Sequence, residues 1–381
     1  MITALINGRV LTDRGVVERR SVLMENGRIL GIAENGDVPD GAATRDMKDS
    51  LLLPGFIDTQ VNGGGGVLFG DAPTVDSLRQ IAAAHMRFGT TGFLPTLISG
   101  DFGLIRAAIA AVQAAMETGV PGILGIHIEG PFLNVARKGI HDASKFRALD
   151  DEAFTILTSA KRGKTMVTLA PEETTPDTIA ALARAGVIVS AGHTDGTYVR
   201  IREALEHGVT GFTHLFNAMS PLRAREPGAV GAALDDAQSY CGIIVDGKHV
   251  DPATLRVALR CKRAEKLMLV TDAMPSVGAA EKRFTLQGRT IVVKEGVCVA
   301  PDGTLAGSDL DMASAVRNAM SMLGLDLKTV VGMAAHNPAA FLGLSHEVGA
   351  LRQGLRANLV CVDDTMAVRE TWIDGQRVYA A

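Results

Sequence analysis

The stretch that decides the fold is Val187-Ile-Val-Ser-Ala-Gly-His-Thr194, together with the similar run Val209-Thr-Gly-Phe-Thr-His-Leu-Phe-Asn217 that follows it. Each is a short apolar run with a histidine, His193 or His214, at its end, and a helix-like segment covers residues 198–207 between them. Two parallel strands need a long crossover connection, which is usually a helix. The stretch therefore predicts two neighbouring parallel strands, each with a histidine at its carboxyl end.

The same alternation of apolar runs and helix-like stretches continues through the middle of the chain. Roughly eight strands alternating with helices are typical of a closed parallel (β/α)₈ barrel. An open doubly wound sheet is the alternative that periodicity leaves open. The expected strands are Phe56–Val61, Thr91–Leu97, Ile123–Ile128, Met166–Leu169, Val187–Ala191, Val209–Thr213, Gly242–Val245 and Leu267–Thr271.

The two ends of the chain resemble each other and differ from its middle. Both contain short apolar runs with a turn dipeptide, such as Asn26-Gly27 and Asp374-Gly375. These dipeptides are strong hairpin signals, and isolated hairpins are marginal in water. We therefore expect residues 1–53 and 346–381 to pair into one small β-sandwich domain, with the barrel formed by residues 54–345.

One segment inside the expected barrel departs from the alternation of strands and helices. Arg283–Val293 is predicted to be a hairpin with Gly288 in its turn. We place it as an inserted hairpin around residues 283–300, after the last barrel strand and before a helix over Met312–Leu323.

Composition limits the possible functions of the chain. It has 381 residues, of which 47% are hydrophobic and 21% are charged, and a formal net charge of -4. These values argue against a nucleic-acid partner. We expect no secretory leader, because the first residues lack a basic segment followed by a long apolar one. No apolar run of about 18 residues is present that would span a membrane. The 4 cysteines are scattered and form no Cys-x-x-Cys pair. We expect them to be buried thiols, and the protein to be cytoplasmic.

Polar side chains that can bind metals follow four different expected strands: Glu129, His193, His214 and Asp272. In a (β/α)₈ barrel the loops after the strands meet at one face. A histidine at a strand end is more often structural, and Glu129 or Asp272 could cap a turn. Their shared position instead favours a metal site with two histidines, one carboxylate and an open position for water and substrate. Such a metal makes hydroxide available near neutral pH.

Two further residues of this region have more than one interpretation. Asp272 is our candidate for the general base and acid, and its alternative role is that of a further metal ligand. His127 lies two residues before Glu129, on the same strand face, and we expect it to support the site from the core.

At these residues the sequence resembles the N-acetylglucosamine-6-phosphate deacetylases of the amidohydrolase superfamily. The resemblance spans essentially the whole chain. The most specific motifs are Glu129-Gly-Pro-Phe132, His214-Leu-Phe-Asn-Ala-Met219 and Arg225-Glu-Pro-Gly228. They are accompanied by Pro54-Gly-Phe-Ile-Asp58, Lys138-Gly-Ile-His141, Ala191-Gly-His-Thr194, Val245-Asp-Gly-Lys-His249 and Val270-Thr-Asp-Ala-Met274.

The resemblance implies hydrolysis of N-acetylglucosamine 6-phosphate to glucosamine 6-phosphate and acetate. It implies that Glu129, His193 and His214 bind the metal, that Asp272 moves the proton and that His141 polarises the acetyl carbonyl. The sugar phosphate would be bound by Asn217, Ala218, Arg225 and His249, with Arg225 reaching across a homodimer interface.

One departure from many amidohydrolases concerns the metal count. Where these enzymes carry His-x-His after the first strand, this chain has Gln60-Val-Asn62, and no bridging lysine is evident after the fourth strand. Amides are poorer ligands for a transition metal than imidazole. We therefore predict one divalent metal per subunit, Zn²⁺ in the first place and Fe²⁺ or another divalent ion as the alternative. We expect Gln60 and Asn62 to bind the substrate instead.

Two rival functions remain at this point. A mononuclear amidohydrolase acting on an N-acyl amino acid or an unphosphorylated acetamido sugar would not need Arg225 and His249 to hold a phosphate. A non-catalytic relative whose barrel serves assembly would not need the three metal ligands and Asp272, all of which are present.

Overall fold

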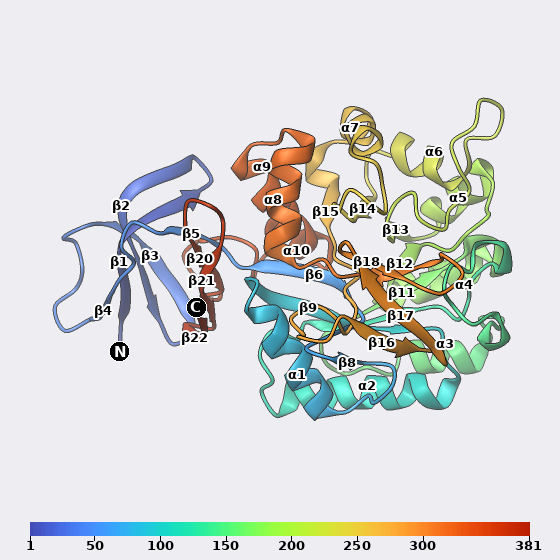
Figure 1. The fold of residues 1–381 in the computed structure, drawn as a ribbon, viewed down its shortest axis with the longest axis horizontal. Helices are drawn as coiled ribbons and strands as arrows, with labels where there is room; N and C mark the ends of the chain where they lie inside the picture. The colour runs from blue at the N-terminus through green and yellow to red at the C-terminus, as the bar shows by residue number, and fades with distance from the viewer.

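Eight parallel strands form the larger part of the structure, which is a computed structural model describing residues 1–381 (Figure 1). They are hydrogen-bonded in the order β15-β14-β13-β12-β11-β10-β9-β6, and every neighbouring pair is parallel. All eight expected strands are confirmed, with ends shifted by a few residues. Their bounds are β6 Phe56–Val61, β9 Thr90–Ile98, β10 Gly125–Glu129, β11 Lys164–Leu169, β12 Ile188–Ala191, β13 Val209–Phe212, β14 Tyr240–Ile243 and β15 Leu267–Leu269.

The sheet curls until its first and last strands nearly meet. A single parallel bridge joins Val61 to Ala273, and the backbone N–H of Asn62 donates to the Ala273 carbonyl at 2.9 Å. Closer to the barrel interior, the Thr271 hydroxyl donates to Asp58 at 2.5 Å. These contacts close the gap between β6 and β15. The barrel prediction is therefore confirmed over the open doubly wound sheet.

Helices between the strands cover the outside of the barrel (Figure 1). Several begin at a side-chain cap: the Thr74 hydroxyl accepts the backbone N–H of Ser77, and the Asp101 carboxylate accepts that of Leu104. Capping satisfies N–H groups that the first helical turn leaves free. The helices are α1 Val75–Met86, α2 Phe102–Glu117, α3 Asp151–Leu157, α4 Pro176–Arg184, α5 Tyr198–Glu206, α6 Gly228–Asp235, α7 Pro252–Cys261, α8 Met312–Leu323, α9 Leu327–Val331 and α10 Asn337–Phe341.

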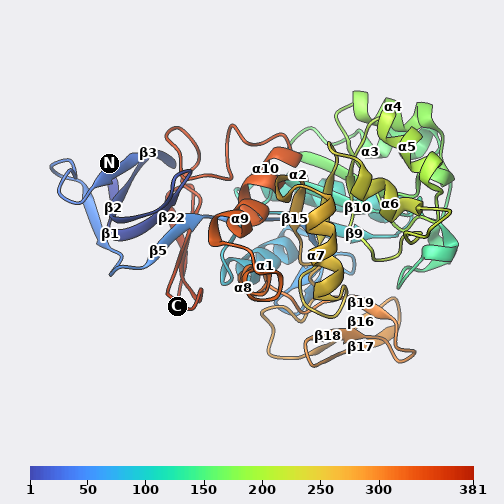
Figure 2. The same ribbon diagram turned by 90° about the horizontal axis from the view of Figure 1, so that it is seen from above.

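The two chain ends form a separate sheet domain beside the barrel, where both termini lie (Figures 1 and 2). Its strand order is β22-β21-β20-β5-β1-β2-β3, with β4 also paired to β1. The antiparallel pair β5–β20 joins the two ends, and Leu5 and Val22 from one end share a buried core with Leu359 and Trp372 from the other. Its strands are β1 Thr3–Thr12, β2 Gly15–Glu25, β3 Arg28–Glu34, β4 Ala43–Asp46, β5 Leu51–Pro54, β20 Leu359–Val362, β21 Val368–Ile373 and β22 Gln376–Ala380. The expected formation of this domain from both ends is confirmed, and its limits at residues 53 and 346 stay a prediction.

The insertion after the last barrel strand is larger than the sequence suggested. The expected hairpin is present as β16 (Arg283–Leu286) and β17 (Arg289–Lys294), with Gln287 and Gly288 at positive φ in its turn. Two more strands, β18 (Val297–Val299) and β19 (Leu305–Ser308), extend it into a four-stranded antiparallel sheet on one side of the barrel (Figure 2). The insertion therefore extends to Ser308 and brings β19 back to the barrel.

The four cysteines are unpaired. Cys241, Cys298 and Cys361 are buried, but Cys261 is exposed at the last position of α7, so the expectation of four buried thiols is wrong for Cys261. Leu255 and Ala258 are the buried residues of α7, and Cys261 lies on its exposed side.

None of the helices combines the length and the apolarity that a membrane crossing requires.

Candidate active site

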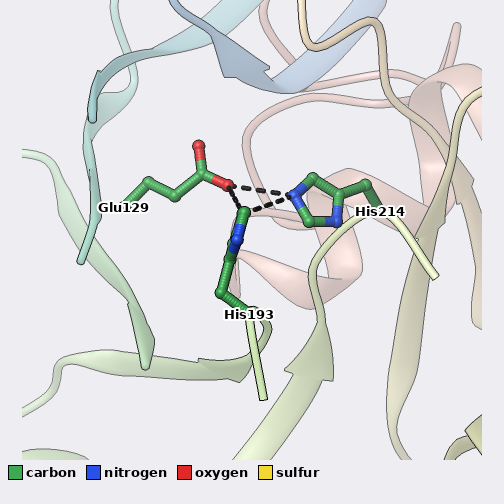
Figure 3. A group of neighbouring side chains, drawn as sticks. All are labelled: Glu129, His193 and His214. Atoms are coloured by element: carbon green, nitrogen blue, oxygen red, sulfur yellow. Dashed lines mark hydrogen bonds and ion pairs between the residues drawn. The ribbon is translucent and has the colours of Figure 1, made fainter. Parts of the chain in front are cut away.

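Glu129, His193 and His214 point toward one another at one end of the barrel (Figure 3). The Nε2 atom of His193 lies 3.2 Å from Glu129 Oε1, and that of His214 lies 3.0 Å from the same oxygen. The two Nε2 atoms are 3.1 Å apart. All three side chains are buried. The structure thus brings together the three residues that the sequence predicts to bind a metal.

Each of these residues lies at the carboxyl end of a different strand. Glu129 is the last residue of β10, while His193 and His214 follow β12 and β13 by two residues. Both histidines have left-handed backbones, with φ of 48° and 34°. Such conformations are uncommon for residues other than glycine and cluster at functional sites. Here they turn both imidazoles from the strand ends toward Glu129.

The donor set fits a divalent metal ion. The Nδ1 atom of His193 lies 2.9 Å from the Arg137 carbonyl, and a carbonyl can only accept, so Nδ1 carries the proton and Nε2 presents its lone pair to the centre. Burial alone would raise the pKa of Glu129, but the neighbouring His193 and His214 side chains lower that pKa well below the usual range. Two imidazoles and one ionised carboxylate are typical ligands of a catalytic zinc-type site.

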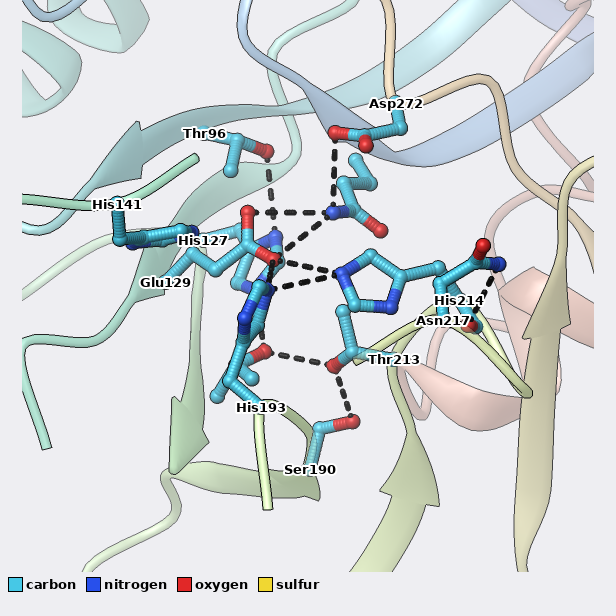
Figure 4. Close-up of polar contacts among 12 residues, drawn as sticks. Thr96, His127, Glu129, His141, Ser190, His193, Thr213, His214, Asn217 and Asp272 are labelled. Carbon is cyan, nitrogen blue, oxygen red and sulfur yellow. Dashed lines mark hydrogen bonds and ion pairs between the residues drawn. The ribbon is translucent and has the colours of Figure 1, made fainter. Parts of the chain in front are cut away.

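Asp272 lies across the site from the histidines (Figure 4). Its Oδ1 accepts hydrogen bonds from the side-chain amides of Asn62 at 2.6 Å and Gln60 at 3.1 Å. Burial, and then the negative charge of Glu129, raise the pKa of Asp272 to about 6. A carboxyl group whose pKa is near neutrality can both accept and return a proton.

Gln60 and Asn62 contact these carboxylates and do not line the pocket. The Gln60 amide nitrogen lies 3.2 Å from both oxygens of Glu129, in addition to its contact with Asp272. Asp58 and Gln60 alternate along β6 and Asn62 directly follows it at the next alternate position, so all three face the barrel interior. This orientation differs from the expectation that Gln60 and Asn62 touch substrate.

His127 lies deeper in the barrel and is completely buried. Its Nδ1 is 3.2 Å from the Thr96 hydroxyl and its Nε2 is 2.7 Å from that of Thr168. Both ring nitrogens are therefore used within the core, beneath Glu129 (Figure 4). Burial lowers the pKa of His127 to about 4, so the ring is neutral near pH 7.

A pocket of about 330 Å³ opens above the three predicted ligands and includes His141 in its wall. The His141 ring centroid lies 4.4 Å from that of His193. Its Nδ1 is 2.8 Å from the hydroxyl of Ser99. Burial, and then the neighbouring His193, lower the pKa of His141 to about 3, so this ring too is neutral near pH 7.

The same pocket is lined by Asn217, Ala218 and His249. The Nδ1 of His249 lies 2.6 Å from Asp246, which leaves the other ring nitrogen without a partner in the chain. The Asn217 amide donates to the His214 carbonyl at 3.1 Å, and Ala218 has a left-handed φ of 50°. Three of the four residues predicted to bind the sugar phosphate therefore line this pocket.

Arg225 is the predicted residue that the structure does not bring to this pocket. It is exposed in the loop before α6 and forms no ion pair within the chain. The neighbouring Leu222 is also largely exposed, and Val199 at the start of α5 is 74% exposed.

Other residues of the pocket have no motif that would have revealed them. Arg137 lies in the short 3₁₀ segment Val135–Arg137, lines the pocket and pairs with Asp195 at 2.8 Å. Thr304, Leu305 and Gly307 form another part of the wall and come from the inserted sheet. The Ser308 N–H donates to the Asp272 carbonyl at 2.9 Å, so the insertion also supports the Asp272 loop.

Comparison with known proteins agrees with this geometry. Residues 51–378 match the amidohydrolase family. The chain is 42% identical to an N-acetylgalactosamine-6-phosphate deacetylase of Shewanella sp. (strain ANA-3), covering 98% of this chain and 95% of that protein. It is 34% identical to an N-acetylglucosamine-6-phosphate deacetylase of Haemophilus influenzae, covering 98% of both.

Solved structures show the same relationship. The N-acetylglucosamine-6-phosphate deacetylase of Pasteurella multocida superposes with a TM-score of 0.96 at 34% identity, over 100% of both chains. The match includes the small sheet domain as well as the barrel. The chain therefore belongs to the amidohydrolase family, is a hydrolase, and within that family is similar to the deacetylases of N-acetylated amino-sugar phosphates.

Proposed function

We propose that this chain removes the N-acetyl group of N-acetylglucosamine 6-phosphate by hydrolysis, giving glucosamine 6-phosphate and acetate. The observation that carries the proposal is the buried group of Glu129, His193 and His214, with Asp272 facing it at the base of one pocket. The deacetylase relatives supply the substrate class.

In this proposal Glu129, His193 and His214 hold one divalent metal ion per subunit, with Zn²⁺ preferred and Fe²⁺ as the alternative. When bound, the ion supplies Lewis acidity and makes water acidic at this position. A count of one is supported by Gln60 and Asn62, whose amide N–H groups face the carboxylates and cannot act as ligands. The same contacts favour a role for both amides in orienting Glu129 and Asp272, rather than direct contact with substrate.

Asp272 accepts a proton from the attacking water and returns it to the departing amine. Its Oδ1 is occupied by the two amide donors, and the second oxygen, Oδ2, is left for the proton. The raised pKa of Asp272, about 6, suits both halves of the transfer near neutral pH. The two amides support this role over that of a further metal ligand.

The remaining residues position the substrate. His141 lies beside His193 and is proposed to polarise the acetyl carbonyl. Asn217, Ala218 and His249 are proposed to hold the sugar phosphate along their wall of the pocket.

Arg225 is proposed to complete the phosphate site of a neighbouring subunit in a homodimer. Its side chain lies outside the pocket of its own chain, and the one arginine that lines this pocket, Arg137, is already paired with Asp195. A phosphate dianion needs strong cationic donors, which Arg225 of a second copy would provide. The exposed Val199 and Leu222 offer apolar contact area for that interface.

N-acetylgalactosamine 6-phosphate is a second candidate substrate. It differs from the first only in the orientation of the C4 hydroxyl, and the 42% identical Shewanella relative is a deacetylase of that epimer.

The test is acetate release by the purified, metal-loaded chain from four compounds: both epimers, each with and without the 6-phosphate. We expect turnover of the phosphorylated sugars only, and the ratio of their kcat/KM values assigns the epimer. Equal rates with and without phosphate would overturn the sugar-phosphate assignment. Elemental analysis of the same sample should give one metal per chain, and a value of two would contradict the interpretation of Gln60 and Asn62.

A further inference from the structure

Ser99 contacts His141 but carries no motif and belongs to no predicted site. It follows β9 directly, so it lies at the carboxyl end of a barrel strand like the predicted metal ligands. The residue is only 5% exposed. Its hydroxyl lies 2.8 Å from His141 Nδ1, and its backbone nitrogen lies 3.4 Å from the same atom.

These two contacts decide which nitrogen of His141 carries the proton. A backbone N–H can only donate, so the Nδ1 atom that faces it must accept. The Ser99 hydroxyl, at the shorter distance, then donates to the same lone pair. A neutral imidazole has a single N–H group, which is therefore at Nε2.

The backbone of Gly130 confines the Ser99 hydroxyl. A Cβ atom added to Gly130 would lie 2.4 Å from Ser99 Oγ, and Gly130 has a φ of +80° that few other residues adopt. Gly130 directly follows Glu129. The residue that follows one predicted metal ligand therefore packs against the hydroxyl that orients His141.

This tautomer matters for the proposed hydrolysis of the acetyl group. An acetyl oxygen gains negative charge during attack on its carbon, and a donor aimed at that oxygen stabilises the transition state. His141 offers such a donor only when Nε2 carries the proton. With the proton on Nδ1, the ring would present a lone pair to the oxygen and repel it.

We infer that Ser99 is a positioning residue, which holds His141 as the Nε2–H tautomer so that the ring donates to the acetyl oxygen. The inference rests on the proposed deacetylation for its consequence, but the tautomer itself does not depend on any substrate.

The test reads the tautomer first. The full-length, zinc-loaded chain is labelled with ¹⁵N-histidine, and the His141 signal is assigned by its loss in His141→Gln. We expect an unprotonated Nδ1 and a protonated Nε2 in the absence of substrate. A proton on Nδ1 would overturn the inference, whatever the chain hydrolyses. If the expected tautomer were found but the chain hydrolysed no acetamido sugar, only the proposed function would be refuted.

Variants then connect the tautomer to turnover. Ser99→Ala removes the shorter contact and leaves only the backbone N–H, at 3.4 Å. Part of the proton should therefore move to Nδ1, and kcat should fall on the order of 10-fold with little change in KM, as for other supporting hydrogen bonds. Ser99→Thr keeps the hydroxyl and should restore both readouts. Ser21→Ala, which removes a buried hydroxyl in the small domain, is the matched control. The role of Ser99 would be overturned if Ser99→Ala matched the Ser21→Ala control in both its Nε2–H signal and its kcat.

Discussion

Replacing Asp272 with asparagine tests the proton shuttle with little disturbance of the site. Asparagine has the same shape as aspartate, and its carbonyl oxygen can still accept from Asn62 at 2.6 Å and Gln60 at 3.1 Å. The change also removes a buried charge that Glu129 repels, so the melting temperature should not fall at about pH 8. The group that is lost is the second carboxylate oxygen, which we propose as the proton acceptor.

We expect Asp272→Asn to lower kcat by roughly 10²- to 10⁴-fold, the usual contribution of a general acid–base group. That loss corresponds to about 2.7 to 5.4 kcal/mol of activation free energy, because each factor of ten is about 1.36 kcal/mol. The wild type should lose activity as the pH falls through the pKa of Asp272, because the ionised form is the base. This pKa is raised to about 6 without a bound cation, and a cation nearby lowers it from that value. The acid limb should disappear from the residual activity of the variant.

Acetate release, metal content and melting temperature are measured on the same preparations. Asp58→Asn is the matched control, since it also removes a buried carboxylate next to the Asp272 loop but leaves the proposed proton acceptor in place. Turnover of Asp272→Asn within about threefold of the control, with one metal bound, would refute the shuttle.

Three further predictions follow from the same structure. Arg225→Ala should raise KM for the sugar phosphate on the order of 10-fold or more with kcat nearly unchanged, because a phosphate contact serves ground and transition states alike; an unchanged KM would contradict its role. Removal of the metal by a chelator should lower the melting temperature, since an ion at a free concentration of about 1,000 times its Kd contributes about 4 kcal/mol to folding. Glu129→Gln should reduce this response. An equal response in the wild type and the variant would count against the site. Burial raises the pKa of Asp58 to about 7 from 3.8. The folded state therefore binds this proton more tightly, and the free energy of unfolding should fall by up to about 4 kcal/mol as the pH rises from about 4 to 7. Urea titrations should show a smaller fall for Asp58→Asn, and an equal slope would refute the assignment.

Most of the barrel could be predicted from the chain because its signals are local. The apolar runs that become β12 and β13, and the helix α5 between them, are visible in one continuous stretch. The inserted sheet shows where such reasoning stops. β16 and β17 were predicted from the turn at Gly288, whereas β18 and β19 were not, although Pro301-Asp-Gly303 between them is a turn signal. The turn signal also does not show that β19 contacts the barrel, where the Ser308 N–H donates to the Asp272 carbonyl.

The sequence by itself determined that Glu129, His193, His214 and Asp272 follow four strands of a parallel barrel, and barrel topology brings such positions to one face. Only the tertiary structure decided which way the neighbouring side chains point. Closure of β6 against β15 turns Gln60 and Asn62 toward Asp272 instead of the pocket. The packing of β9 beside β10 brings Ser99 to His141. These contacts join residues far apart in the chain, so no local pattern of residue types encodes them, and they form only when the strands are assembled.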